Sequence, residues 1–280
     1  MNIKKITLRT IYHVLMILAS FAMLYPLFWM VSSSLKPSDE IMRTAQNLIP
    51  RNPTIENYIH GWKGFARYTF ATFFKNSFIM TIVRTVGTVI SSSLTAYAFA
   101  RIPFKGRKLW FAIMIGTMCL PGMALQIPQY LMFNDFGWVG TWKPLLLPCW
   151  FGGGAFNVFL LMQFMKNIPR DMDEAATIDG CGWFGLYGRI MLPLIVPALC
   201  SVAVLTFIGA WGDFYSALIY LNKPAYYPVA YALKLYSDEV STNYGPMLAM
   251  SVLSLVPIMI LFLIFQKSLV EGISTSGIKG

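Results

Sequence analysis

The sequence predicts an all-α polytopic membrane protein with about six transmembrane helices and one short helix outside the membrane. Hydrophobic residues make up 56% of the 280 residues and charged residues only 12%, whereas roughly 25% of residues are charged in ordinary soluble domains. Six apolar stretches are each long enough to cross a hydrocarbon core of ~30 Å. A polar segment separates the fourth stretch from the fifth. We interpret residues 1–280 as a single transmembrane domain.

The six predicted spans contain about 20 or more residues each, the length that a transmembrane helix requires. The first follows basic residues and so has the order of a secretory signal. Its apolar run is longer than the usual signal core of about 7 to 15 residues, and no soluble domain follows it, so we interpret it as a retained span. The spans are residues 11–32, 77–100, 109–133, 144–165, 192–213 and 246–266.

The distribution of lysine and arginine predicts that both termini are cytoplasmic. Six spans place both termini on one side, and a cytoplasmic N-terminus puts 12 of the 22 basic residues inside, as the positive-inside rule requires. The basic outer segment 33–76 is an exception, but long loops weigh less in this rule. The net charge of +10 therefore reflects topology, and we expect no nucleic-acid partner. The 12 inner residues are Lys4, Lys5, Arg9, Arg101, Lys105, Arg107, Lys108, Lys166, Arg170, Arg189, Lys267 and Lys279.

The sequence contains no pattern typical of an enzyme or a metal site. Its two histidines, His13 and His60, are not part of an HExxH motif, and no GxxxxGK[ST] phosphate loop occurs. The four cysteines lack CxxC or Cys/His spacing and are interpreted as small apolar side chains. We expect no cofactor in this chain, so a transport cycle driven by ATP requires ATP and Mg²⁺ on another polypeptide. The cysteines are Cys119, Cys149, Cys181 and Cys200.

The polar segment 167–193 is predicted to carry a short helix that docks on a soluble partner. Asn167 can cap the helix, Pro169 suits its first turn, and three acidic residues then face the positive end of the helix dipole. Gly180 supplies the left-handed residue that ends it. We expect about 11 residues, roughly 16 Å. A short surface helix in an ordinary loop is the alternative. The clustered surface side chains are Met172, Ala175, Ala176 and Thr177, and the acidic ones are Asp171, Asp173 and Glu174.

The order of residues in this segment resembles the signature loop of the membrane subunits of binding-protein-dependent ABC importers. The loop reads Glu174-Ala175-Ala176, then Ile178-Asp179-Gly180, then Ile190 and Leu192-Pro193. From about residue 20 to the C-terminus the chain resembles the carbohydrate-uptake branch, and within it the second membrane subunit of the maltose-type transporter. The further motifs are Ser34-Leu35-Lys36-Pro37, Pro53 to Tyr58, Asn76-Ser77, Ala96 to Arg101, Leu120-Pro121, Trp211 to Phe214 and the tail from Glu271 to Gly280.

This resemblance implies a permease that moves a carbohydrate, most simply an oligosaccharide, across a bacterial cytoplasmic membrane by alternating access. The implied partners are a second permease, two ATPase subunits that bind ATP and Mg²⁺, and an extracytoplasmic solute-binding protein. Within the coupling loop 167–190, it assigns the charged ATPase contact to Glu174 and the re-entry turn to Gly180. The tail 271–280 is expected at the ATPase interface. The expected ATPase-coupling residues are Glu174, Ala175, Ala176, Asp179 and Gly180.

Polar and aromatic residues near the outer ends of two spans are candidates for the translocation path. Gln126, Gln129 and Tyr130 share one helical face at positions i, i+3 and i+4. Trp211 and Asp213 combine a ring that can stack on a sugar with a carboxylate that accepts hydroxyl hydrogen bonds. The alternatives are helix-to-helix hydrogen bonds for the first group and the interfacial aromatic belt for Trp211.

Glycines and prolines predict two irregular places in the spans. Gly152, Gly153 and Gly154 interrupt the fourth span, as a hinge or as a place of close packing. Pro193 and Pro197 open the fifth span, where a bend would tie the docking loop to the membrane pathway. The rival function is a self-sufficient secondary transporter or channel. It would need a coupling-ion site or a ring of pore-lining groups, and no carboxylate is apparent at mid-depth.

Overall fold

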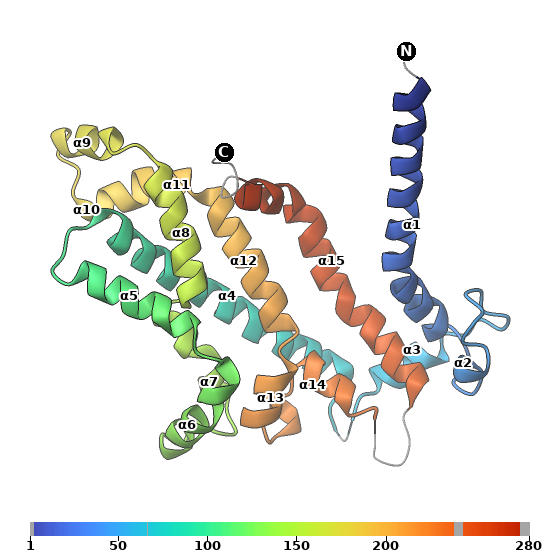
Figure 1. The fold of residues 1–280 in the computed structure, drawn as a ribbon. Coiled ribbons are helices and arrows are strands. Elements are labelled where there is room, and N and C mark those ends of the chain that lie inside the picture. Colours follow the sequence, from blue (N-terminus) through green and yellow to red (C-terminus); the bar gives the residue numbers. More distant parts are fainter. Residues whose placement is uncertain (1–2, 66, 238–242, 275–280) are drawn as a thin grey trace. The chain divides into compact units, whose positions relative to one another are not determined.

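The computed structural model describes residues 3–65, 67–237 and 243–274, and the described part of the chain is helical without a named strand. This confirms the predicted all-α class. Figure 1 labels the elements. They are α1 (Ile3–Ser34), α2 (Glu40–Arg43), α3 (Glu56–Trp62), α4 (Phe70–Arg101), α5 (Arg107–Met118), α6 (Gly122–Asp135), α7 (Lys143–Leu146), η1 (Pro148–Trp150), α8 (Ala155–Asn167), α9 (Asp171–Ile178), α10 (Trp183–Gly185), η2 (Leu186–Met191), α11 (Leu192–Leu194), α12 (Val196–Trp211), α13 (Phe214–Tyr220), η3 (Pro224–Tyr226), α14 (Val229–Lys234) and α15 (Tyr244–Ser274).

The number of membrane spans agrees with the sequence. Among the described residues, four helical segments are long and apolar enough to cross a membrane, and two bent helix pairs raise the number to six if each pair is one span. The predicted span 109–133 is the one most changed, because α5 and α6 meet at an angle of 102°. Pro121 stands at this break with an extended backbone, as expected for a residue that cannot donate to a continuing helix.

Of the three glycines that interrupt the fourth span, Gly153 packs closely against α4. Gly152, Gly153 and Gly154 all have positive φ angles, of 93°, 62° and 84°, so the predicted helix 144–165 is interrupted and α8 begins at Ala155. A β-carbon on Gly153 would lie 2.6 Å from the β-carbon of Ser92 on α4. Of the two interpretations left open by the sequence, the contact with α4 supports close packing.

The fifth span is bent where its prolines predict. A π-helical turn, η2, leads into α11, and α12 leaves at an angle of 77°. Pro197 occupies the first turn of α12, where its missing N–H costs no helical hydrogen bond. The bend therefore joins the segment that follows α9 directly to a transmembrane helix.

The chain groups into two compact units, built from residues 1–71 with 233–256 and from residues 72–232 with 257–280. The single-domain interpretation stays a prediction. In the first unit, buried Lys36, which follows α1, donates to the carbonyls of Thr44 and Asn47 at 2.9 and 2.6 Å. Asn57 of α3 donates to the carbonyls of Ser34 and Lys36. These bonds fasten the segment around α2 to α1.

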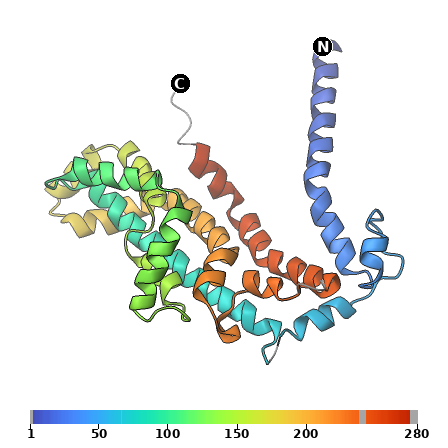
Figure 2. The same cartoon turned by 60° about the horizontal axis from the view of Figure 1, so that its bottom comes forward.

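The second unit has a core formed by α4, α8, α9, η2 and α12. In it, α8 packs on both α5 and α12, as Figure 2 also shows. One apolar cluster lies beneath α9 and joins it to the membrane helices. The cluster comprises Ala96, Tyr97 and Ala100 of α4, Val158, Leu161, Met162 and Met165 of α8, Ala176 of α9, Leu186 and Met191 of η2, Ile195, and Ala198 and Val202 of α12.

Candidate functional site

The short polar helix exists, but it starts later than the sequence predicts. The helix α9 has 8 residues, Asp171–Ile178, with its three acidic residues in the first turn. Asn167 is the last residue of α8 and does not cap α9; the N-cap position belongs to Arg170, which makes no side-chain capping bond. Pro169 lies in the extended connection between the two helices. Gly180 follows α9 with a φ of +78°, which confirms its predicted left-handed turn.

The exposed face of α9 includes most of the expected coupling residues. Glu174, Ala175 and Asp179 are exposed, and Ile178 is 86% exposed. Ala176 is only 7% exposed and packs in the core of its own chain. Its expected role as docking surface is corrected, because its methyl group anchors α9 from beneath. The helix thus presents a carboxylate and an apolar side chain outward.

An ion pair anchors α9 at its first turn. The guanidinium Nη1 of Arg101, the last residue of α4, lies 2.9 Å from Oδ2 of Asp173. Nη2 of Arg101 donates to the carbonyls of Met165 and Ile168, at 2.6 and 2.7 Å. The Arg101 side chain is 2% exposed and that of Asp173 19%. One side chain therefore binds the ends of α4 and α8 to the beginning of α9.

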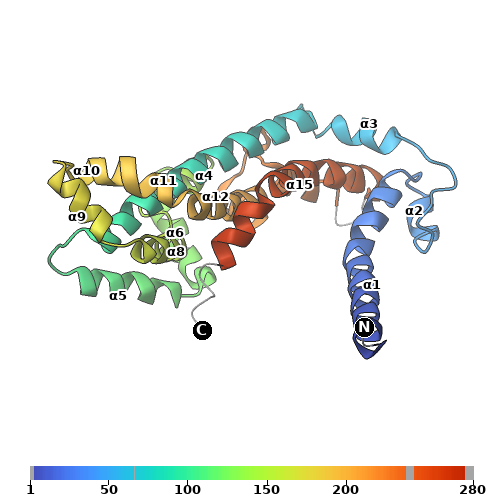
Figure 3. The same cartoon turned by 90° about the horizontal axis from the view of Figure 1, so that it is seen from above.

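The segment that follows α9 is held by α4 as well. The hydroxyl of Tyr97 donates to the carbonyl of Trp183 at 2.9 Å, and the hydroxyls of Ser93 and Tyr187 lie 2.8 Å apart. Figure 3 shows α9, α10 and the C-terminal end of α4 gathered at the same end of this unit. Both sides of the polar loop are thus attached to one transmembrane helix.

A groove of about 520 Å³ runs beside α9. Its charged side chains comprise the carboxylates of Asp173 and Glu174 and the guanidinium groups of Arg101 and Arg170. The half-exposed ring of Trp183 lies on the same groove. The groove therefore combines charges of both signs with an apolar ring, and the carboxylate of Asp173 is already paired with Arg101. The remaining lining residues are Pro103, Thr177, Ile178 and Leu186.

Trp211 and Asp213, two of the predicted path residues, are engaged by the chain itself. Trp211 is 4% exposed, and its ring packs edge-on against that of Phe78 of α4, with centroids 4.8 Å apart. Oδ2 of Asp213 lies 2.7 Å from Nη1 of Arg84, also on α4. Oδ1 of Asp213 accepts a bond from the N–H of Ser216 and so caps α13. Both oxygens of this carboxylate therefore have partners within the chain.

The other three path residues lie on α6. Gln126 is half-buried, whereas Gln129 and Tyr130 are exposed. The ring of Tyr130 stacks on that of Tyr220 of α13, with centroids 6.2 Å apart. In Figure 1, α6 and α13 lie at the end of this unit opposite to α9. The structure thus attaches α6 to α13 and attaches Trp211 and Asp213 to α4, and the expected convergence on one cavity stays a prediction.

Sequence reasoning missed the roles of three buried or half-buried basic residues. Arg84 lies inside the predicted span 77–100, and a charge in an apolar span is itself a signal of function or pairing. Arg101 enters the sequence analysis as a cytoplasmic positive charge and as the end of the motif Ala96 to Arg101. Its place at the end of a span, next to the polar loop, also makes it a candidate partner for that loop. Lys36 is part of the motif Ser34 to Pro37 and one of the basic residues of the outer segment 33–76, and no local pattern in the sequence predicts its burial.

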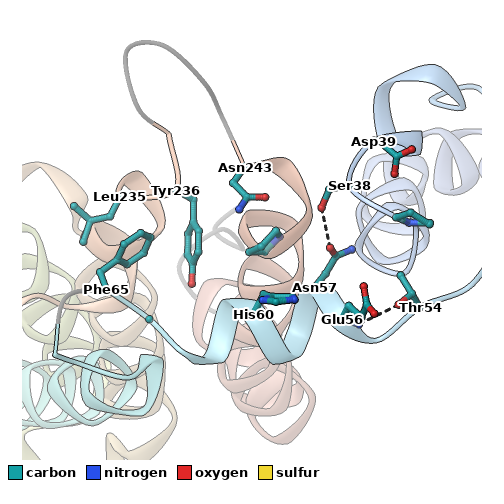
Figure 4. A pocket seen from close by; sticks show the side chains of 13 residues that line it. Ser38, Asp39, Thr54, Glu56, Asn57, His60, Phe65, Leu235, Tyr236 and Asn243 are labelled. Atoms are coloured by element: carbon teal, nitrogen blue, oxygen red, sulfur yellow. Dashed lines mark hydrogen bonds between the residues drawn. The ribbon is translucent and has the colours of Figure 1, made fainter.

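The first unit contains a cavity of about 670 Å³, shown in Figure 4. The carboxylates of Asp39 and Glu56 and the imidazole of His60 line it. Tyr236 donates its hydroxyl hydrogen to the carbonyl of Gly61 at 2.6 Å, and burial raises the pKa of this hydroxyl, so it stays protonated. The cavity offers hydrogen-bond acceptors and negative charge. Its other lining residues are Pro37, Ser38, Thr54, Asn57, Gly64, Phe65, Leu235, Asn243 and Pro246.

No group of three or more metal-binding side chains occurs among residues 3–65, 67–237 and 243–274. All four cysteines are free. Of the tail residues expected at an ATPase interface, 275–280 lie outside the described residues. The side chains of 271–274 are likewise not described.

Comparison with known proteins identifies relatives over nearly the whole chain. Residues 87–275 match the family described as "Binding-protein-dependent transport system inner membrane component". A probable ABC transporter permease of Bacillus subtilis is 33% identical over 95% of this chain and 87% of its own length. The arabinooligosaccharide transport permease of Halalkalibacterium halodurans is 32% identical over 93% of each chain. The trehalose/maltose transport permease of Thermococcus litoralis is 32% identical over 94% of each chain.

A solved structure has the same fold. It is a chain of a bacterial ABC transporter involved in the import of the acidic polysaccharide alginate, and it superimposes with a TM-score of 0.83. The match covers 95% of this chain and 98% of that chain, at 22% sequence identity.

Proposed function

Because this chain belongs to the family of binding-protein-dependent transport system inner membrane components, we propose that it is the permease subunit of an ATP-driven carbohydrate importer. It is a multi-pass membrane protein, and its membrane helices form part of the translocation pathway. The cycle we propose is rigid-body alternating access, in which the helices rock between inward-open and outward-open states. ATP is hydrolysed on separate subunits that dock on α9.

The observation that supports this coupling role is the construction of α9. The helix projects Glu174, Ala175 and Ile178 outward, while Ala176 and Asp173 fix it to the membrane helices from beneath. A free surface helix would need no such anchor. An exposed carboxylate beside a groove and a rigid connection to the membrane are what a partner needs to transmit force.

The proposed substrate is a carbohydrate, and an oligosaccharide in particular. The support comes from relatives that are named as transport permeases for arabinooligosaccharides, for trehalose or maltose, and for sulfoquinovosyl glycerol. The names differ in the sugar, so the family relation supports the chemical class rather than one compound. Gln126, Gln129, Tyr130, Trp211 and Asp213 remain our candidates for the path on this subunit.

The proposed assembly contains this chain, a second permease, two ATPase subunits and an extracytoplasmic solute-binding protein. The N- and C-termini and α9 face the cytoplasm in this proposal, in agreement with the positive-inside count. The tail 271–280 reaches the ATPase subunits. A secondary transporter is the less favoured function, because the family name itself specifies dependence on a binding protein.

The decisive variant is Glu174→Ala. We expect the complex to reach the membrane, because this side chain is exposed and touches no span. We expect uptake to be lost, because without the carboxylate of Glu174 the partner's charge is left unpaired when the subunits dock. The measurement is uptake together with ATP hydrolysis stimulated by the binding protein. Asp171→Ala is the matched control, since it removes an exposed carboxylate from the same helix. Normal coupled activity in Glu174→Ala would remove the docking assignment.

A further inference from the structure

We propose that Arg101, with Asp173, is a positioning residue that makes α9 and the ends of α4 and α8 one rigid block, so that a push on α9 moves two transmembrane helices together. This inference rests on the proposed function, because it assumes that a partner displaces α9. It concerns how the displacement enters the membrane.

The geometry of the Arg101 guanidinium supports this proposal. Nη1 binds the carboxylate of Asp173, and Nη2 binds the carbonyls of Met165 and Ile168. These carbonyls belong to the last turn of α8 and to its C-cap, Ile168. The carbonyl of Met165 also accepts the N–H of Ile168 at 3.3 Å, so the guanidinium reinforces the C-terminal end of the helix. A planar guanidinium holds such acceptors in fixed directions, whereas the compact ammonium of lysine does not. The guanidinium of Arg101 thus joins α4, α8 and α9 in a fixed geometry.

Burial indicates that the pair specifies geometry more than it adds stability. The Arg101 side chain is 2% exposed, and its Nε has no hydrogen-bond partner among the described residues, nor does Oδ1 of Asp173. Taking two charges out of water costs about as much as their attraction returns. Removing one partner, however, strands the other charge. The contact is therefore intolerant of separation, which is the property a mechanical link needs.

The second anchor of α9 lacks this directional property. Ala176 contacts the core through a single methyl group, and apolar contacts permit sliding because they have no preferred direction. In the part of the chain that the structure describes, the Arg101–Asp173 pair is the ion pair that reaches α9. The charged contact therefore fixes where the first turn of α9 stands relative to α4 and α8.

The test uses the assembled transporter in proteoliposomes, with Asp173→Asn and Arg101→Lys. In each variant we expect ATP hydrolysed per substrate transported to rise about fivefold or more, the factor typical of a lost coupling between sites. The matched controls are Asp171→Asn and Arg189→Lys, two exposed residues of the polar segment 167–193 that do not line the groove beside α9, and both should keep the wild-type ratio. A merely structural pair would lower assembly, hydrolysis and transport in parallel and leave the ratio unchanged, which would overturn the proposal.

A distance measurement gives a second readout. Spin labels at Asn167 and Ile178, both exposed, should keep one narrow distance in the nucleotide-free and ATP-bound complex, and Asp173→Asn should broaden it. If Asp173→Asn does not assemble, Asp173→Glu keeps the charge, displaces it by one methylene and should show the same broadening. Unbroadened distances in the assembled variants would contradict the proposal.

The docking role of α9 and the Arg101–Asp173 link can be contradicted independently. If Glu174→Ala loses stimulated hydrolysis while Asp173→Asn keeps the wild-type ratio, the link alone is wrong. If Glu174→Ala behaves as wild type, the docking role of α9 is wrong.

Discussion

Asp213 shows how one residue can satisfy two interpretations of a sequence. As an acidic residue beside Trp211 it predicts a sugar contact, yet its two oxygens bind Arg84 and the N–H of Ser216. Both side chains of the ion pair are less than a quarter exposed, at 21% and 16%. A carboxylate used in this way stabilises the connection between α4 and α13 in the conformation described here.

The variant Asp213→Asn separates these two roles. It keeps an oxygen that can cap α13 and removes the charge that pairs with Arg84, so a structural pair should cost about 1 to 3 kcal/mol of stability. We expect a lower thermal unfolding midpoint of the detergent-solubilised protein. Asp135→Asn, an exposed residue on α6, is the control. An unchanged midpoint together with an altered apparent affinity for the sugar would favour the path interpretation instead.

Residue types and local order allowed part of the site to be predicted. Gly180 was predicted because a left-handed turn favours glycine, and its φ is +78°. The burial of Ala176 was not predictable, because two adjacent alanines have the same side chain and only tertiary packing decides which one faces the core. The partners of Arg101 and Arg84 lie 72 and 129 residues away, and no local pattern specifies such pairs.

At the scale of elements, the bends decide how the membrane helices connect to the polar loop. Proline and glycine residues predicted the helix breaks near Pro193 and at Gly152 to Gly154. The break between α5 and α6 was missed, although Pro121 lies there, because the apolar composition continues across it. Hydropathy measures where a chain is apolar, but it does not measure the direction of the helix.

Gly180 offers a test at this scale. Gly180→Ala places an L-residue at φ +78°, which costs about 1 to 2 kcal/mol, and Gly180→Pro cannot adopt this conformation at all. Nothing lies within 4 Å of a β-carbon at this position, so the effect comes from the backbone alone. We expect reduced coupled uptake in the first variant and none in the second.

Gly182→Ala is the matched control, because Gly182 has a φ of −77° and equal space around it. Equal uptake in Gly180→Ala, Gly180→Pro and Gly182→Ala would show that the turn after α9 has no part in coupling.

At the scale of the whole molecule, the proposed function requires that the chain is oriented in the membrane with α9 on the cytoplasmic side. Ile178 of α9 and Ile49 of the segment before α3 are highly exposed, at 86% and 82%. We expect cysteine at Ile178 to react with a membrane-impermeant thiol reagent only from the cytoplasmic side, and cysteine at Ile49 only from outside. The background should lack the four native cysteines. Labelling of both positions from one side would contradict the predicted topology.

The central claim is that this chain imports a carbohydrate only with ATP and a binding protein. The most direct measurement is uptake of a labelled oligosaccharide into proteoliposomes that contain the purified complex, with ATP, binding protein or an ion gradient supplied separately. The account predicts uptake that requires ATP and the binding protein together and is unaffected by dissipating the gradient. Uptake driven by an ion gradient in the absence of ATP would contradict it.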